Sequence, residues 1–177
     1  MNLYFRLIWT IIRSFFKPKI DFSDEIVLKL LIFPNDLDIN RHLNNGRYLT
    51  ILDLGSIDLF LRSGVLGRAI RSGFRPMIGG LFVTYRNSLS LFEQCTLTMK
   101  LKAWDDYWNY FKFEFRKVDG RLSASGYFKG AFVSKNGLVP NNVADEIFEY
   151  KHGFCELPPV VENWIRAENH LSGESIT

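Results

Sequence analysis

The chain has 177 residues, a length that fits one domain with a single buried core. Apolar residues make up 47% and aromatic residues 15% of it, which excludes disorder over most of the chain. The formal net charge is only +3 and the charges are evenly spread, so we expect no nucleic-acid partner.

The N-terminal segment is strongly apolar, but it is shorter than the ~20 residues that a membrane-spanning helix needs. Its polar residues recur at helical spacing and form one stripe: Asn2, Arg6, Thr10, Arg13 and Lys17. We therefore predict an amphipathic helix in residues 1–20, ended by Pro18. Residues 1–17 are expected to lie on a membrane surface, or else to pack on the domain or a partner subunit. The segment lacks the small-residue cleavage site of a secretory signal, and an uncleaved signal anchor is the least favoured of the three alternatives.

Residues 25–33 are rich in β-branched and aliphatic side chains and predict a buried strand. The polar residues 35–45 then predict a loop. A helix begins after Asn44 or Asn45, because either side chain can accept a hydrogen bond from the first free N–H groups. The helix is apolar nearly all round until Gly64 ends it, which predicts a buried helix.

Four β-rich segments follow, and short turns at 105–106 and 119–120 join the last three. They are residues 76–85, 95–104, 107–118 and 122–133. We predict a short helix in residues 141–150, a helical stretch from Pro158 to Trp164 and a loose tail. The simplest arrangement is an antiparallel sheet curled around the long buried helix, with two such units paired.

The two cysteines, Cys95 and Cys155, lie far apart in sequence and predict neither a disulfide framework nor a zinc site. With three histidines in the chain, we predict no metal site and no cofactor. A reducing cytoplasmic setting fits best, and we expect the protein there, peripheral on the inner face of a membrane.

Chemically useful side chains are concentrated in residues 36–48, between the strand and the buried helix. The segment holds two carboxylates, a histidine, several amides and a tyrosine. Free N–H groups at a helix N-terminus polarise a carbonyl oxygen. A carboxylate held nearby can activate water or attack directly. Thioester hydrolysis needs little beyond these two parts.

The same segment, Asp-x-Asp-x-x-x-His-Leu-Asn-Asn-x-x-Tyr, resembles the 4-hydroxybenzoyl-CoA thioesterase-like branch of the hot-dog superfamily. Residues 82–93 and the turn at 104–106 are also similar, especially to the thioesterase superfamily member 6-like proteins. The likeness covers about residues 1–165. It implies an α+β hot-dog fold with an antiparallel sheet around a long buried helix and an extra N-terminal amphipathic helix. The domain would span residues 21–165, with a C-terminal tail in 166–177.

The resemblance implies that Asp38 is the catalytic carboxylate and that the amides of Asn45 and Gly46 face the thioester oxygen. His42, Asn45 and Tyr48 would shape the site or bind the acyl group. One departure is Arg41, because many members have glycine there. Its side chain could close the site, pair with Asp38, or attract a CoA phosphate.

Each of these residues also has a purely structural alternative. Asp38 can be a turn residue, and His42 a packed loop residue. Asn44, a further substrate-binding candidate, is chiefly a helix cap, and Asn45 can equally be a cap or a site residue. Tyr48 can be a core residue with a satisfied hydroxyl. Two further residues have alternatives of their own. Asp53, a carboxylate in the apolar helix, is either a second site acid or, as we favour, the partner of an arginine. Arg86 is a candidate CoA-phosphate contact or a solvated cation.

The leading hypothesis is an acyl-CoA thioesterase that releases a fatty or aryl acid from CoA. The carrier is CoA or acyl carrier protein, and the assembly is a homodimer or homotetramer. The alternative is a non-catalytic acyl-binding or membrane-associated interaction protein that keeps the fold. A hot-dog hydratase is disfavoured, because no proline follows Asp38-Ile39-Asn40 and the spacing to His42 is short for its motif.

Overall fold

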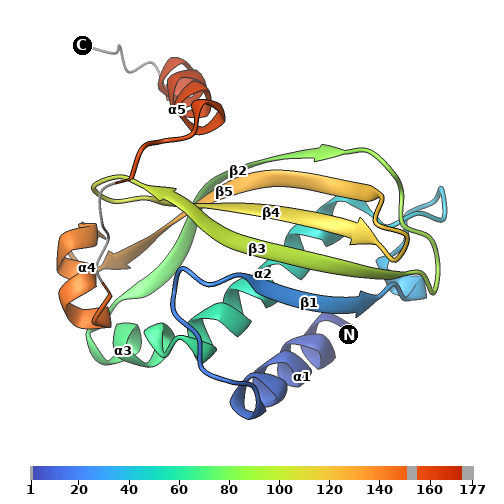
Figure 1. The fold of residues 1–177 in the computed structure, drawn as a ribbon, viewed down its shortest axis with the longest axis horizontal. Coiled ribbons are helices and arrows are strands. Elements are labelled where there is room, and N and C mark those ends of the chain that lie inside the picture. The colour runs from blue at the N-terminus through green and yellow to red at the C-terminus, as the bar shows by residue number, and fades with distance from the viewer. Residues whose placement is uncertain (1, 151–154, 173–177) are drawn as a thin grey trace.

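The computed structural model describes residues 2–150 and 155–172. Figure 1 shows its helices and strands. In chain order they are α1 (Asn2–Phe16), β1 (Ile26–Leu31), the short 3-10 helix η1 (Pro34–Asp36), α2 (Asn45–Arg62), α3 (Val65–Arg71), β2 (Arg75–Tyr85), β3 (Gln94–Trp104), β4 (Asn109–Lys117), β5 (Leu122–Ser134), β6 (Gly137–Val139), α4 (Asn141–Phe148) and α5 (Pro159–Ser172). The predicted strands and the long helix are confirmed, whereas η1, α3 and β6 carry no signal that we recognised.

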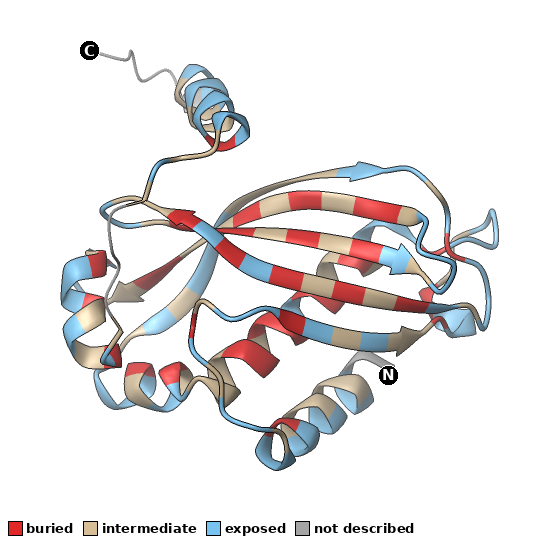
Figure 2. Cartoon of the chain, viewed as in Figure 1, coloured by how far each residue is buried: buried red, intermediate tan, exposed pale blue. Residues whose placement is uncertain are grey.

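The strands form one antiparallel sheet in the order β1-β3-β4-β5-β2, with β6 paired to β5. The sheet curls around α2 (Figure 1). On β4 the alternation of side chains decides which face is buried. Phe111, Phe113 and Phe115 are at most 2% exposed, whereas the intervening Lys112 and Glu114 form an ion pair on the outer face. Buried residues alternate with more exposed ones along the strands (Figure 2), and the predicted α+β hot-dog architecture is confirmed.

Helix α2 begins at a capped end and ends at a glycine. The Asn44 side chain accepts a hydrogen bond from the Gly46 N–H at 2.9 Å, as a helix cap does. After the last turn, Gly64 has a φ of 75°, a left-handed conformation that favours glycine. In mid-helix, a Cβ on Gly55 would lie 3.2 Å from a methyl group of Leu97, so glycine permits close contact with the sheet.

Helix α1 packs beside α2 (Figure 1), and Arg6 and Lys17 of its polar stripe face inward, whereas Arg13 is exposed. Arg6 bonds Asp36 at 2.7 Å, while Ser14 and Lys17 bond Asp58 at 2.6 and 2.9 Å. Packing on the domain is therefore the arrangement observed, and the polar side makes the contact. The opposite side, here called the outer face of α1, is exposed and consists of Tyr4, Phe5, Ile8, Trp9, Ile12, Phe15 and Phe16.

Helix α5 lies on the outer side of the sheet, opposite α2 and near one end of the strands (Figure 1). Its Val161 is buried, its Trp164 packs edge-on against Phe82, and its Glu168 forms an ion pair with Lys129. The helix extends past its predicted end at Trp164 to Ser172, because these contacts continue along the sheet. The predicted tail is thus helical over 166–172, and 173–177 lie outside the described residues.

Candidate active site

The loop between η1 and α2 forms a small hairpin. At its base, the Asn44 N–H donates to the Asp36 carbonyl oxygen at 2.9 Å, and Leu37 and Leu43 form a bridge above it. At its tip, the Asp38 N–H donates to the carbonyl oxygen of His42 at 2.9 Å. The hairpin thus holds Asp38 beside the N-terminus of α2.

The Asp38 carboxylate is half-buried, and its two oxygens have different environments. Oδ1 accepts hydrogen bonds from the Asn40 N–H at 2.8 Å and the His42 N–H at 3.3 Å. This is the turn-forming role that the sequence left open. Oδ2 has no hydrogen-bond partner among the described residues. One oxygen therefore fixes the orientation of the group, and the other is available for chemistry.

The N-terminus of α2 offers one open amide. The Gly46 N–H donates to the Asn44 side chain, and the Arg47 N–H donates to the Asn44 carbonyl oxygen at 2.8 Å. The Asn45 N–H has no acceptor within the described part of the chain. The expectation that Gly46 presents its N–H to a ligand is therefore not met, because the cap occupies it. Of the two predicted amides, only that of Asn45 is left without an acceptor among the described residues.

Asp38 and Asn45 open onto one pocket of about 270 Å³, which also brings together the predicted His42, Tyr48 and Arg86. Other side chains line it that the sequence did not reveal, namely Tyr85, Asn87, Ser88 and Ser123. They come from the end of β2, the following loop and β5. Tyr85, Asn87 and Ser88 flank Arg86 in the run 82–93, whereas Ser123 reaches the pocket only because β5 pairs with β2.

Tyr48 and Tyr85 form the inner wall of this pocket. The Tyr48 hydroxyl hydrogen-bonds the Ser123 hydroxyl at 2.8 Å, so its structural alternative, a satisfied core residue, is also correct. Burial raises the pKa of Tyr48, and the bond to Ser123 offsets only part of that, so the hydroxyl stays neutral. The Tyr85 hydroxyl donates to the Asn45 carbonyl oxygen at 3.1 Å and ties β2 to the start of α2.

The sequence model of the Thioesterase-like superfamily matches residues 32–165, which include this hairpin, α2 and the sheet. The chain belongs to this superfamily. Protein THEM6 of Xenopus laevis is 28% identical to it over 142 residues, covering 80% of this chain and 68% of that protein. The resemblance to thioesterase superfamily member 6-like proteins is confirmed.

Two solved structures show the same superfamily fold. The probable thioesterase YbaW from Escherichia coli has a TM-score of 0.65 at 17% identity, covering 70% of this chain and 96% of that one. A Staphylococcus aureus protein in complex with CoA has a TM-score of 0.61 at 15% identity, covering 82% and 96%. At these identities, the likeness establishes the hot-dog thioesterase fold and nothing finer.

Arg41 has the left-handed backbone conformation that glycine favours. It has a φ of 60°, which glycine adopts without steric cost, and its N–H donates to the Asp38 carbonyl oxygen at 3.0 Å. Its side chain is exposed, and it makes no ion pair with Asp38 or any other described residue. Of the three alternatives for Arg41, the pairing with Asp38 is therefore absent from the structure.

A second cavity, of about 470 Å³, lies between α2 and the sheet. Its wall is mostly apolar and includes Phe60, Met77, Phe128 and Phe132. Asp53 also lines it, and burial raises the pKa of that carboxyl group. The favoured pairing of Asp53 with an arginine is wrong, since no ion pair involves it in the described ranges.

A cysteine nucleophile does not fit this superfamily member. Cys95 is 2% exposed on β3, and burial raises the pKa of its thiol to about 12. A thiol with that pKa is almost wholly protonated at neutral pH and is a poor nucleophile.

Proposed function

We propose that the protein is an acyl-CoA thioesterase that hydrolyses a fatty or aryl acyl-CoA to the free acid and CoA. The observation that carries this proposal is that Asp38, with a free carboxylate oxygen, and Asn45, with an open N–H, line the same small pocket. Superfamily membership supports it. A thioester carbonyl placed there would have a polarising donor on its oxygen and a base or nucleophile beside its carbon.

The Asp38 oxygen acts in one of two ways. As a base, it takes a proton from water while that water attacks the carbonyl carbon, and the C–S bond then breaks to release the CoA thiolate. As a nucleophile, it forms an acyl anhydride with loss of the thiolate, and water then cleaves the anhydride. The Asn45 N–H stabilises the oxyanion in both cases. The exposed Arg86 at the pocket wall supplies a cation for a CoA phosphate.

We infer that the acyl chain lies in the larger apolar cavity. We also infer that dimerisation places this cavity beside the Asp38 pocket. Strand β2 is an edge strand whose outer side is free to pair with a second copy. In an antiparallel β2–β2 pair, residues 76–78 of one protomer would lie across from residues near Tyr85 of the other. Residues 76–78 line the cavity, and Tyr85 lines the Asp38 pocket. Each acyl chain would then occupy the cavity of the partner.

The test is release of free thiol from a panel of acyl-CoAs, followed with DTNB, for wild type and Asp38→Asn. The variant keeps the turn but loses the base, so we expect turnover to fall by about 10²–10³-fold with unchanged stability. Glu146→Gln, an exposed acid on α4, is the matched control and should keep wild-type turnover. Equal turnover in Asp38→Asn and Glu146→Gln would remove the mechanism.

The alternative, a membrane-associated acyl-binding protein, has its own supporting observation in the outer face of α1. Phe15 and Phe16 are 73% and 87% exposed there, beside the exposed cations Arg13 and Lys19. Aromatic residues with flanking cations suit a lipid interface. No helix within residues 2–150 and 155–172 is long and apolar enough to cross a bilayer. We propose that this face lies on the cytoplasmic surface of a membrane, where the free thiols stay reduced.

Sedimentation with vesicles of phosphatidylcholine and a minor fraction of phosphatidylserine tests the membrane face. The double variant Phe15→Ser/Phe16→Ser should lose most of the bound fraction, whereas Val118→Ser, an exposed apolar position elsewhere, should not. Acyl-CoA binding without thiol release at every chain length would favour the non-catalytic alternative. Equal sedimentation of all three proteins would exclude the membrane face.

A further inference from the structure

Resting on the proposed function, we propose that Arg6 of α1 is a positioning residue for the reaction loop. It holds the hairpin that presents Asp38, although the two residues are far apart in sequence and Arg6 does not line the pocket. Helix α1 would thus be part of the machinery of the site as well as a surface element.

The guanidinium of Arg6 binds where β1 passes into η1. Its Nη2 donates to the Leu31 carbonyl oxygen at 2.6 Å and to Asp36 Oδ2 at 2.7 Å. The guanidinium carbon also lies 5.1 Å from the centre of the Phe33 ring. The Arg6 side chain is only 13% exposed, so these contacts are made largely away from water. Arg6 therefore fixes the end of β1 and the start of the loop together.

Asp36 passes this constraint to the hairpin. Its side chain is 3% exposed and accepts hydrogen bonds from Arg6 and the Phe33 N–H, while its backbone carbonyl accepts the Asn44 N–H at the base of the hairpin. Asn44 in turn caps α2, and it thereby fixes the position of the open N–H of Asn45, the first residue of the helix. Displacing Asp36 would therefore move Asp38 and the Asn45 N–H relative to each other.

Without Arg6, the buried carboxylate of Asp36 would keep only a weak interaction with a cation. The other cation near it is Arg47, whose Nε lies 3.8 Å from Oδ1, at the limit of an ion pair, and whose Nη2 is bound to the Asn35 carbonyl oxygen. A buried carboxylate that loses its main partner takes up water or moves toward it. Both responses loosen the base of the hairpin.

The chain offers a matched comparison in Lys17. It lies on the same helix, in the same interface with α2, and it also pairs with a buried carboxylate, Asp58. However, Asp58 is in the last third of α2 and touches no residue of the hairpin. Loss of Lys17 loosens α1 without touching the loop, so any effect specific to Arg6 must pass through Asp36.

The experiment compares Arg6→Met, Arg6→Lys and Lys17→Met in full-length protein. Steady-state thiol release from an acyl-CoA gives kcat and KM, and hydrogen exchange followed by mass spectrometry reports on residues 36–46. We expect Arg6→Met to lower kcat by about 10- to 100-fold with KM nearly unchanged, because small displacements of catalytic groups cost that much. Exchange in 36–46 should speed up, Arg6→Lys should recover part of kcat, and Lys17→Met should leave kcat and that exchange as in wild type.

The outcomes separate this inference from the proposed function. If wild type releases thiol and Arg6→Met matches Lys17→Met in kcat and exchange, Arg6 is only a structural contact and the inference is wrong. If wild type releases no thiol from any substrate, the proposed function fails. Hydrogen exchange still decides in that case whether Arg6 holds the loop.

Discussion

Helix α2 and the loop before it carry four carboxylates that the fold treats in two opposite ways. On the side of α1, Asp36 and Asp58 are buried and bonded to cations. Facing the two cavities, Asp38 and Asp53 make no ion pair within the described residues. The contrast shows that α1 neutralises the acids that hold the structure, while the acids without a cation are left facing space that a substrate could fill.

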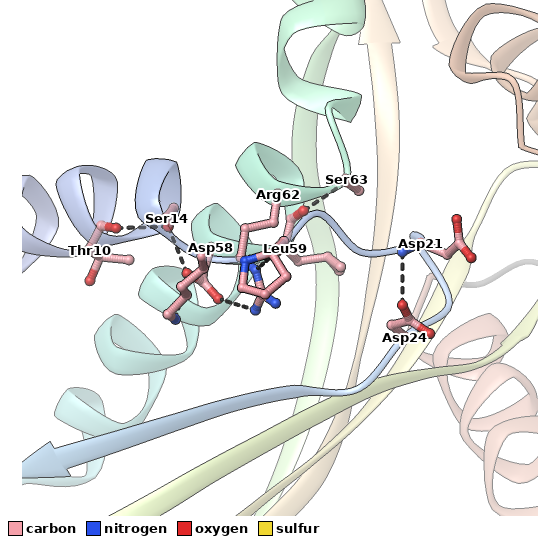
Figure 3. Close-up of polar contacts among 10 residues, drawn as sticks. Thr10, Ser14, Asp21, Asp24, Asp58, Leu59, Arg62 and Ser63 are labelled. Atoms are coloured by element: carbon pink, nitrogen blue, oxygen red, sulfur yellow. Dashed lines mark hydrogen bonds and ion pairs between the residues drawn. The ribbon is translucent and has the colours of Figure 1, made fainter.

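The two acids within α2 show the physical basis most directly. Burial alone would raise the pKa of both groups. At Asp58, hydrogen bonds from Ser14, Lys17 and Arg62 outweigh burial and lower its pKa (Figure 3). Asp53 has no such bonds, and its pKa is raised. The hydrogen-bonding partners of an acid therefore decide the direction of its pKa shift, even for two acids on the same helix.

Removing the paired acid should have the largest effect on stability. Asp58 is fully buried, and Asp58→Ala removes the carboxylate that Lys17, Arg62 and the Ser14 hydroxyl share, leaving two cations without their counter-charge. We expect the free energy of unfolding to fall by about 3 kcal/mol, as for other broken buried ion pairs. Urea denaturation followed by circular dichroism measures it. A loss as small as that of an exposed-site control such as Glu146→Ala would contradict the contrast.

Asp58 should contribute to the pH dependence of stability. Its pKa is lower in the folded than in the unfolded protein, so the unfolded state binds the proton first as pH falls. The stabilisation is therefore complete above the unfolded value of about 3.9 and is lost below it, as pH falls through the folded pKa. Urea midpoints between neutral pH and pH 3 should fall more steeply for wild type than for Asp58→Asn. Parallel curves would mean that Asp58 does not contribute.

The sequence predicted those parts of the fold that depend on neighbours along the chain. The alternation of apolar and charged residues determines which face of β4 is buried, and the apolar residues all round α2 predicted that this helix is buried. The Asn44 cap and the concentration of groups in 36–48 were also local signals, and they located the hairpin correctly. Tyr85 and Ser123, by contrast, meet at the pocket only because β2 and β5 pair, a long-range contact that no local pattern encodes.

The orientation of α1 shows the same limit more sharply. Periodicity established that its polar residues share one stripe, but not which way the stripe faces. That depends on Asp36 and Asp58, which lie 30 and 44 residues along the chain from Arg6 and Ser14. Two buried acids attract the cationic side inward and leave the aromatic side exposed. An amphipathic pattern fixes the existence of two faces, and tertiary partners fix their direction.

Filling the apolar cavity should change selectivity more than stability. Gly130 lines the cavity, and a Cβ there would lie no closer than 3.5 Å to its neighbours, so a larger side chain can enter. We expect Gly130→Leu to lower kcat/KM for long acyl chains about tenfold relative to short ones, since each lost methylene contact is worth about 1 kcal/mol. Gly67→Leu, at an open surface position, is the control. An equal loss of kcat/KM at every chain length would mean that the cavity does not bind the acyl chain.

The smallest effect should come from the unpaired acid of α2, and its sign should be opposite to that of Asp58. Because burial raises the pKa of Asp53, its charged form is disfavoured in the folded protein at neutral pH. The folded state then binds the proton first as pH falls, so this group's penalty disappears in acid. Asp53→Asn should therefore leave stability unchanged or raise it by less than about 0.5 kcal/mol at pH 7. The gain should vanish well below the unfolded pKa of about 3.9, because the wild-type carboxyl group is then protonated in both the folded and the unfolded state. A measured loss of stability at pH 7 would reveal a partner for Asp53 and would break the division between acids that hold the fold and acids that face its cavities.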